Sequence, residues 1–401
     1  MRPAPIRRGR PVRTRRRFAA ALLVAGACTA GLLAGPPGAV AAGEPGQAAR
    51  EDRDLREALE GLVASPGGPP GAIALLQRGR DVRVYRAGVA DVESGRPPRP
   101  GDHMRLASVS KAYSGAVALQ LVERGKLRLD DTIGTRLPRL PRAWHKVTLR
   151  QLLQHTSGLP DYTESPEFQQ ALLSDPRREF DPRRLMDFVA DEPLMFRPGS
   201  RFRYDNSDNI VVALMTEAVT GTPYEELLRR LVYRPLDLRR TSLPRGYLLP
   251  RPYLHGYDTE PGRPPEDVST TFGASSVWAS GGIVATPADL NTFMRAYAGD
   301  RLLSPAVRKQ QTVWVNGSSG PPGPGRNQAG LALFRYTTRC GVVHGHTGNF
   351  FGYTQFAATT PDGRRSVTVS ITTQTNETTK PALLKRLRAV EEDFVCALLK
   401  R

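Results

Sequence analysis

Ser108-Val109-Ser110-Lys111 begins an apolar stretch, residues 108–125, that has helical spacing and ends at Gly125. Residues three apart in a helix lie on one face, so Ser108 and Lys111 are expected to be neighbours. The free N–H groups at the start of a helix favour negative charge on a reacting carbonyl oxygen. Burial lowers the pKa of an ammonium group, which would let Lys111 take or relay the Ser108 proton. The stretch predicts a serine nucleophile with a lysine partner.

Two later segments carry side chains that would complete such a site. In Tyr204-Asp205-Asn206, the first and third residues are two apart ahead of a helical pattern. In extended backbone their side chains would share one side. His346-Thr347-Gly348 ends a predicted strand, where Gly348 would let a ligand approach the backbone closely. Each motif alone is a weak signal, and the combination favours a catalytic interpretation.

Strand patterns lie near both ends of the chain, and helical patterns fill the middle. We expect strands at 72–76, 82–87, 330–336, 341–347, 352–360 and 365–373, and helices at 54–63, 108–125, 148–156, 183–192, 208–220, 223–231, 285–297 and 381–399. The Gly- and Pro-rich segment 315–329 is expected to be a flexible loop. We predict an α/β (α+β) fold in which residues 42–125 and 258–401 form a sheet region. Residues 126–257 would be a mainly helical region of the same catalytic unit.

The order Ser-x-x-Lys, Tyr-x-Asn, His-Thr-Gly resembles that of the serine penicillin-recognising enzymes. The similarity is to the branch that contains class C β-lactamases and exported D-alanyl-D-alanine carboxypeptidases. It covers about residues 53–399 and includes the framing segments Leu152–Leu159, Pro235–Leu238, Ala279–Gly282 and Gly345–Gly348. The resemblance implies the β-lactamase/transpeptidase-like fold: an antiparallel sheet built from both chain ends, flanked by helices, with a helical insertion.

The resemblance also implies roles for individual residues. Ser108 would be the acylated nucleophile, Lys111 its proton partner and Tyr204 a proton shuttle to the leaving group; the choice of base between Lys111 and Tyr204 stays open. Asn206 would bind the substrate amide, and the backbone N–H groups of Ser108 and Asn349 would form the oxyanion hole. His346, Thr347 and Gly348 would help to place the substrate and its carboxylate.

Some residues depart from the pattern of the family. Asp205 stands where Ser is frequent, and His346 stands where serine β-lactamases usually carry Lys. Carboxypeptidases of the branch can carry Arg directly after the Gly-Leu-x-Leu run, whereas here Phe334 follows Gly330–Leu333 and Arg335 comes one residue later. Because neighbouring strand residues face opposite sides, Arg335 is a poor substitute, which puts strict carboxypeptidase specificity in doubt.

The expected activity is that of a serine-type D-alanyl-D-alanine carboxypeptidase, acting on peptidoglycan stem peptides through an acyl-serine intermediate without metal or cofactor. β-Lactam antibiotics would be covalent inhibitors, and the protein is expected to be a monomer. One alternative is a class C-like β-lactamase, an esterase or a D-aminopeptidase on the same site. Another is a catalytically idle wall-binding or drug-sensing protein.

The N-terminal residues have the three-part layout of a secretory signal. Residues 1–17 are Arg-rich, residues 18–34 are apolar, and Ala39-Val40-Ala41 offers a cleavage pattern. Arg15-Arg16-Arg17-Phe18 also fits a twin-arginine address. We expect residues 1–41 to be removed on export, leaving a secreted protein without a stable membrane anchor; an uncleaved anchor is the alternative.

The cysteines and the charge bear on disulfide formation and on nucleic acid binding. Cys340 and Cys396 would be the two cysteines of the mature chain, and in an exported protein they are expected to be bonded. The formal charge of +18 suggests nucleic acid binding, but eight Arg and no acid lie in residues 1–41. The other basic residues are scattered and form no cluster with aromatics, so we do not expect a nucleic acid partner.

Overall fold

The computed structural model describes residues 45–299 and 301–400, so the proposed signal at 1–41 lies outside the described residues. Within them, strands from both ends of the chain form one eight-stranded sheet in the order β2-β1-β12-β11-β10-β9-β8-β7. The strands are β1 (Gly71–Arg78), β2 (Asp81–Gly88), β7 (Val315–Asn316), β8 (Arg326–Ala329), β9 (Phe334–Thr338), β10 (Gly341–Phe350), β11 (Tyr353–Thr359) and β12 (Arg365–Ile371). The predicted β-lactamase/transpeptidase-like fold, with an antiparallel sheet, is confirmed.

The two ends of the chain meet in the pairing of β1 with β12. This antiparallel register runs from Ala72 opposite Ile371 to Arg78 opposite Arg365. β1 also forms the predicted hairpin with β2, and Gly79 in its turn has φ +61°, a conformation that glycine adopts without a steric penalty. The sheet therefore cannot form until the last third of the chain pairs with the first.

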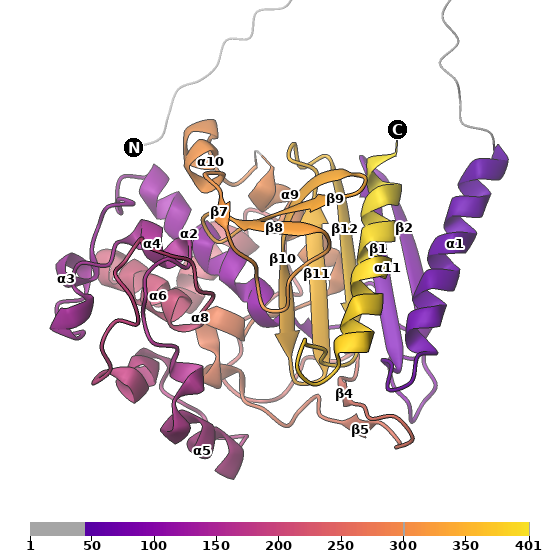
Figure 1. Ribbon diagram of the computed structural model, residues 1–401, viewed down its shortest axis with the longest axis horizontal. Coiled ribbons are helices and arrows are strands. Elements are labelled where there is room, and N and C mark those ends of the chain that lie inside the picture. Colours follow the sequence, from indigo (N-terminus) through magenta and orange to yellow (C-terminus); the bar gives the residue numbers. More distant parts are fainter. Residues whose placement is uncertain (1–44, 300, 401) are drawn as a thin grey trace, which may run out of the picture. The chain divides into compact units, whose positions relative to one another are not determined.

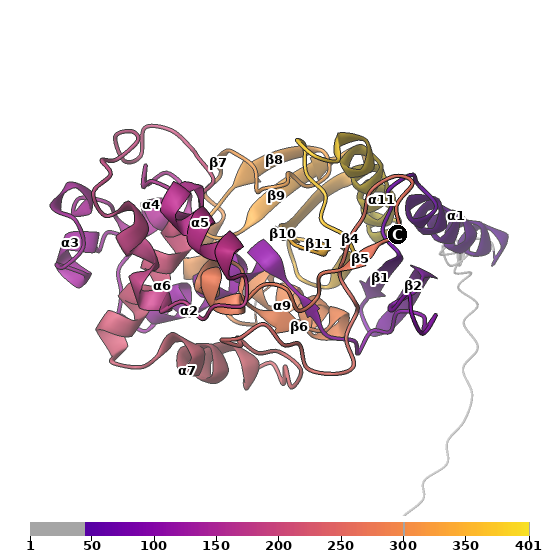
Figure 2. The same cartoon turned by 90° about the horizontal axis from the view of Figure 1, so that it is seen from below.

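Helices cover both faces of the sheet (Figures 1 and 2). α1 (Pro45–Val63) and α11 (Pro381–Leu399) contact each other and one face, while α9 (Pro287–Ala298) packs on the other. The alternation of β1 explains both layers. Ala72, Ala74 and Leu76 belong to the core under α1 and α11, whereas Ile73 and Leu75 belong to the core on the opposite side.

The helical region surrounds α2 (Ser110–Glu123), whose residues are buried from Ser110 to Leu121. A helix that is buried on all sides needs apolar or small residues all round, which its sequence supplies. The other α-helices are α3 (Ile133–Arg136), α4 (Leu149–Leu153), α5 (Pro166–Ser174), α6 (Ser207–Thr220), α7 (Tyr224–Leu228), α8 (Trp278–Gly281) and α10 (Pro305–Gln311). Two small antiparallel pairs, β3 (Met104–Arg105) with β6 (Val284–Ala285) and β4 (Tyr257–Asp258) with β5 (Glu266–Asp267), complete the fold.

The segment 315–329 differs from the expected flexible loop. It contains β7 and β8, and the residues between them make long-range hydrogen bonds. Arg388 Nε donates to the backbone oxygen of Pro322 at 3.1 Å, and Thr347 Oγ1 donates to that of Pro321 at 2.6 Å. Gly and Pro indicate irregular backbone correctly, but they say nothing about partners that lie far away in sequence.

Smaller corrections concern element type and bounds. The helix expected at 183–192 is a 3-10 helix at Pro182–Val189, and the one at 223–231 is α7 followed by a π turn at Arg229–Tyr233. The strand expected at 330–336 begins at Phe334, because Ala332 has φ +51° and interrupts extended backbone.

The predicted disulfide is present: Cys340, just before β10, is bonded to Cys396 in α11. It ties the last helix to the strand that carries His346. Among the described residues, no helix has the length and apolar character that a membrane span requires.

Candidate functional site

Ser108 lies in a 3-10 turn, Ala107–Val109, that leads directly into α2. Ala107, the residue before it, has φ +50°, which is unfavourable for a residue with a Cβ. Such strain persists only where the surroundings hold it in place, and it is common beside reactive groups. Here Ser110 Oγ accepts a hydrogen bond from Ile283 N at 3.1 Å, which anchors the start of the helix. Ser108 is thereby held at a sharp bend rather than along a regular helix.

Lys111 is fully buried, and its ammonium group is directed at the serine. Nζ lies 3.2 Å from Ser108 Oγ and 2.9 Å from the backbone oxygen of Ser280. Burial lowers the pKa of Lys111 to about 8, although nearby carboxyl groups act in the opposite direction. A substantial fraction of the amine is therefore neutral just above pH 7. It can accept the Ser108 proton at the predicted contact.

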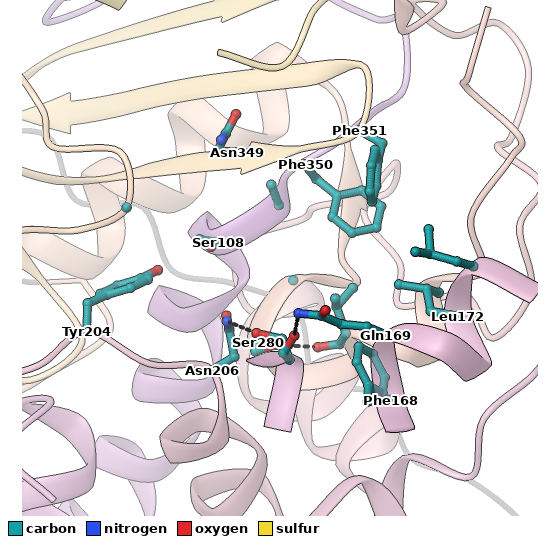
Figure 3. Close-up of a pocket in the computed structure, with 16 residues that line it drawn as sticks. Ser108, Phe168, Gln169, Leu172, Tyr204, Asn206, Ser280, Asn349, Phe350 and Phe351 are labelled. Carbon is teal, nitrogen blue, oxygen red and sulfur yellow. Dashed lines mark hydrogen bonds between the residues drawn. The ribbon is translucent and has the colours of Figure 1, made fainter. Parts of the chain in front are cut away.

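Tyr204 completes the immediate surroundings of the serine. Its ring centre lies 4.9 Å from Lys111 Nζ, and its hydroxyl points into the cavity on the side of Ser108 (Figure 3). Burial raises the pKa of Tyr204 well above its ordinary value, and the neighbouring Ser108 hydroxyl only partly offsets this. The phenol is thus neutral when the enzyme is at rest. It can pass a proton on, but it is a poor acceptor.

Asn206 lines the cavity, and its amide is bonded to other side chains of the site. Its Oδ1 accepts from Lys111 Nζ at 2.8 Å, and its Nδ2 donates to Asp161 Oδ2 at 3.0 Å and to Thr163 Oγ1 at 3.1 Å. Both ends of the amide are therefore engaged within the protein. Sequence reasoning missed Asp161, which follows directly on the framing segment Leu152–Leu159 and the residue Pro160.

The part of β10 that carries the His-Thr-Gly motif lies against the serine turn. Its pairing with β9 runs from Gly341 to Gly345, and beyond that point the strand contacts the turn at 107–109. A Cβ on Gly348 would lie 2.3 Å from the Leu106 oxygen, so only glycine fits at this crossing. Gly348 was expected to let a ligand approach the backbone closely. In the structure it is the backbone of Leu106 that makes this close approach.

Asn349 lines the cavity with Ser108, as the predicted oxyanion hole requires. Its side chain points away from the cavity (Figure 3), and Oδ1 accepts from Thr354 Oγ1 at 3.0 Å and from Thr375 N at 3.3 Å. The side chain is thus occupied elsewhere. The backbone of Asn349 is the part that can serve a substrate.

His346 and Thr347 do not lie where a carboxylate could reach them directly. The His346 ring is fully buried behind Tyr204, and Nδ1 donates to the Thr347 oxygen at 2.6 Å. Burial lowers the pKa of His346 to about 3, so the ring is neutral at neutral pH. Thr347 Oγ1 lies 2.6 Å from Ser319 Oγ. Because the ring lies in the interior, the predicted contact of His346 with a substrate carboxylate is not made directly in this arrangement and stays a prediction.

Ser108, Tyr204 and Asn206 line a cavity of about 420 Å³. Apolar side chains form much of its wall: Phe168, Leu172, Leu173, Val277, Phe350 and Phe351. Figure 3 shows how α5 contributes one side of this wall. Among the described residues that line the cavity, none is Lys, Arg or His.

Sequence reasoning had found only part of this wall. Of the aromatic residues near the serine, Phe168 and Phe350 line the cavity, whereas Trp278 packs in the core with Nε1 donating to Glu225 Oε1. Leu172, Leu173 and Gln169 were missed. Ser165 followed by Pro166 is a typical helix start, so the sequence could have predicted that α5 begins there. It could not have predicted that this helix lies beside Ser108.

Other chemically interesting residues lie outside the cavity. His155 Nδ1 is 3.0 Å from Asp208 Oδ2, and burial raises the pKa values of Asp205 and Asp208 well above their usual range. Arg335 donates from Nη1 to Gln328 Oε1 at 3.4 Å and does not line the cavity. In the described part of the chain, no group of His, Cys, Asp and Glu side chains could hold a metal ion.

Comparison with known proteins gives a consistent family. The family model described as "Beta-lactamase" matches residues 55–392. An esterase, EstB of Burkholderia gladioli, is 36% identical over 42% of this chain and 46% of its own length. A D-aminopeptidase of Gluconobacter oxydans is 26% identical over 67% of this chain and 50% of its own length. The chain thus spans about half the length of these curated relatives.

A solved structure matches over a larger share of both chains. It is a D-stereospecific amidohydrolase from a Streptomyces species, with a TM-score of 0.72 and 30% identity over 84% of this chain and 98% of that one. The neighbours therefore share the fold and the family while carrying different names.

Proposed function

This chain belongs to the β-lactamase family of serine hydrolases, and we propose that it cleaves D-configured amide or peptide bonds next to an apolar side chain. One observation carries the proposal: Ser108 and Tyr204 line a cavity of about 420 Å³ with a largely apolar wall, and the buried Lys111 lies behind them, 3.2 Å from Ser108 Oγ. An apolar cavity favours an aromatic or aliphatic substrate side chain, because burial of its surface is worth about 25 cal/mol per Å². Similarity to the D-stereospecific amidohydrolase supports the D configuration.

The chemistry follows from the positions of three side chains. Ser108 Oγ attacks the substrate carbonyl carbon while its proton passes to the neutral amine of Lys111, 3.2 Å away. The backbone N–H groups of Ser108 and Asn349 would stabilise the oxyanion. When the C–N bond breaks, the proton returns through Tyr204 to the departing amine. A water molecule then hydrolyses the acyl-serine ester and regenerates Ser108.

Lys111 is the better candidate for the base. Its pKa of about 8 leaves part of it neutral under ordinary conditions, whereas burial makes the Tyr204 phenol harder to ionise. The matching of a base to the working pH is what favours efficient proton transfer. Tyr204 would then act as the carrier of the proton rather than its first acceptor.

A D-alanyl-D-alanine carboxypeptidase acting on peptidoglycan stem peptides, and inhibited by β-lactams, is the second candidate. Such an enzyme needs hydrogen-bond donors for the terminal carboxylate of the substrate. The hydroxyls of Ser319 and Thr347 are candidates, because Ser319 bonds Thr347 and precedes Gly320, which lines the cavity. These hydroxyls now bond each other and the Pro321 oxygen. A shift of this loop would turn them toward the cavity, so this candidate requires a rearrangement that the first does not.

The test is a substrate panel with the Ser108→Ala variant as control. It contains D- and L-phenylalaninamide, a diacyl-Lys-D-Ala-D-Ala tripeptide, a p-nitrophenyl ester and nitrocefin. We expect D-phenylalaninamide to be cleaved at least about tenfold faster than its enantiomer, a difference of about 1.4 kcal/mol between the transition states. Preference for the tripeptide would establish the carboxypeptidase, and fast nitrocefin turnover a β-lactamase. Failure of every compound to acylate Ser108 would leave an idle wall-binding or drug-sensing protein.

We also propose that the protein is exported and acts on the outer side of the membrane as a monomer. The layout of residues 1–41 and the bond between Cys340 and Cys396 support export, since disulfides persist mainly in oxidising compartments. Replacement of Arg15 and Arg16 by Lys should retain the protein inside the cell if the signal is of the twin-arginine type. Unchanged secretion would exclude that route, and detection only in the cytoplasm in wild type would overturn export.

A further inference from the structure

The carboxyl group of Asp161 is connected to Lys111 through one intervening side chain, that of Asn206. It is 7% exposed and accepts four hydrogen bonds: from Thr163 N and Oγ1 at 3.0 and 2.8 Å, and from Asn206 N and Nδ2 at 2.9 and 3.0 Å. A carboxylate is acceptor-only, so a group that receives donors on both oxygens is well suited to this place. Asp161 does not line the cavity, and the reaction as described above does not use it.

These contacts set the orientation of the Asn206 amide. The Nδ2 end faces Asp161, and the Oδ1 end faces Lys111 Nζ at 2.8 Å. If the amide were turned over, its oxygen would meet the carboxylate and its NH₂ group would meet the ammonium. One contact would then bring two hydrogen-bond acceptors together and the other two donors. Buried polar groups would be left without partners, which is unfavourable. The two charged neighbours therefore allow one orientation only.

On the premise of the proposed acyl-serine hydrolysis, we infer that Asp161 is a positioning residue. It holds the Asn206 amide so that the amide oxygen, with a negative charge behind it, faces the amine of Lys111. In this arrangement Asp161 reaches Lys111 through one intervening side chain and never touches the substrate. Its effect would be to fix the direction of the lysine and to favour its protonated form.

Other titratable groups also face Lys111. Asp205 and Asp208, from the start of α6, are fully buried, and burial raises their pKa values well above the usual range. His155 and His346 approach from the other sides, and burial lowers the pKa of each to about 3. Tyr204 is a neutral phenol. Of the carboxyl groups that raise the pKa of Lys111, that of Asp161 acts most strongly, ahead of those of Asp205 and Asp208.

The test compares the pH dependence of kcat/KM for p-nitrophenyl acetate in wild type and Asp161→Asn. In wild type, the rise of activity with pH should be centred near pH 8, where Lys111 loses its proton. Loss of an opposite charge at this range lowers the pKa of an amine, so in Asp161→Asn the midpoint should move about one pH unit lower. The plateau value of kcat should fall as well, because an Asn at 161 tolerates either orientation of the Asn206 amide.

Two further variants separate charge from structure. In Asp205→Asn, which removes a carboxyl group that acts on Lys111 less strongly than that of Asp161, the midpoint should move less than in Asp161→Asn. In Thr163→Val, which removes a hydrogen bond to Asp161 and to Asn206 but no charge, kcat should fall while the midpoint stays. If Asp161→Asn does not fold, Thr163→Val tests the proposal on its own. An unchanged kcat in Thr163→Val would overturn the positioning role of Asp161.

The failures of the two proposals are distinguishable. If wild type is acylated at Ser108 and the midpoint of Asp161→Asn does not move, only the role of Asp161 is wrong. An equal shift in Asp205→Asn would also overturn it, because the effect would then not be specific to Asp161. If wild type is not acylated by the ester at all, the proposed hydrolysis itself fails, and the role of Asp161 fails with it.

Discussion

Thr347 Oγ1 lies 2.6 Å from the backbone oxygen of Pro321, 26 residues earlier in the chain. Through this contact the loop between β7 and β8 closes over the end of the strand that carries the His-Thr-Gly motif. The motif residues expected to meet a carboxylate are therefore turned inward. The open part of the site is the apolar cavity beside α5.

Replacement of Ser108 by Ala should abolish covalent labelling by a fluorescent penicillin and reduce hydrolysis at least about a thousandfold, since the nucleophile is lost. Ser108 is the only Ser in the chain followed three residues later by Lys. The far-UV circular dichroism and the melting temperature should stay close to wild type. Labelling that persists in the variant would place the nucleophile elsewhere.

The activity of wild type should rise with pH through the titration of Lys111. As a base, Lys111 must be neutral, and its pKa of about 8 means that kcat/KM is low well below pH 8 and levels off above it. The measurement is kcat/KM from pH 5 to 10 with an uncharged ester or amide. A midpoint near 6 or below would exclude Lys111 as the group that limits the reaction.

His346 should not contribute charge to substrate binding. Because burial lowers its pKa to about 3, kcat/KM for a carboxylate-terminated peptide and for its amide should change in parallel between pH 5 and 8. His346→Lys would place an unpaired ammonium in the interior and should destabilise the protein by about 3 to 5 kcal/mol. A carboxylate-specific loss of activity through pH 6 to 7 would restore the charged role.

The same shift predicts how acid affects the fold. The folded pKa of His346 lies below the unfolded value of 6.5, so its neutral ring favours the folded state above pH 6.5, and this contribution is lost as pH falls toward 3. In His346→Gln, which cannot titrate, the free energy of unfolding should depend less on pH in that window. Urea unfolding at pH 7 and pH 4 measures the difference, and equal slopes for both proteins would contradict the burial argument.

Two exposed leucines offer a matched test of the cavity. Leu173 lines it at 67% exposure, whereas Leu248 is 65% exposed and does not line it. Leu173→Ala should lower kcat/KM for D-phenylalaninamide a few-fold, about 1 kcal/mol of lost apolar contact. Leu248→Ala should leave it unchanged. Equal effects, or none in either variant, would place the substrate side chain elsewhere.

Reduction of the bond between Cys340 and Cys396 should lower stability. The cysteines are 56 residues apart, and a closed loop of that length is worth about 4 kcal/mol in the chain-entropy model. Thermal unfolding with and without reductant, with Cys340→Ser as control, measures the loss. The reductant should have no effect on the variant. An unchanged melting temperature in reduced wild type would show that packing of α11 on the sheet is sufficient and that the disulfide adds no stability.

The sequence by itself determined the family, the antiparallel sheet from both chain ends and the local contact between Ser108 and Lys111. The strands and the Ser108–Lys111 contact follow from short-range rules, alternation in strands and the spacing of a helix, whereas the family and the sheet that joins both chain ends follow from motifs in a fixed order along the chain. α11 was predicted with its observed bounds because its pattern is long and strongly periodic. Local rules suffice where the partners are close in sequence.

Only the tertiary structure decided which groups face the substrate. Asp161 meets Asn206 across 45 residues, Ser319 meets Thr347 across 28, and α5 brings Leu172 and Leu173 to the serine without any motif that announces it. The protonation of His346 is decided in the same way: it depends on burial, and burial is set by elements packed from several parts of the chain. The identity of the catalytic residues is a property of the sequence, whereas the polarity of the cavity and the protonation of its side chains arise from packing.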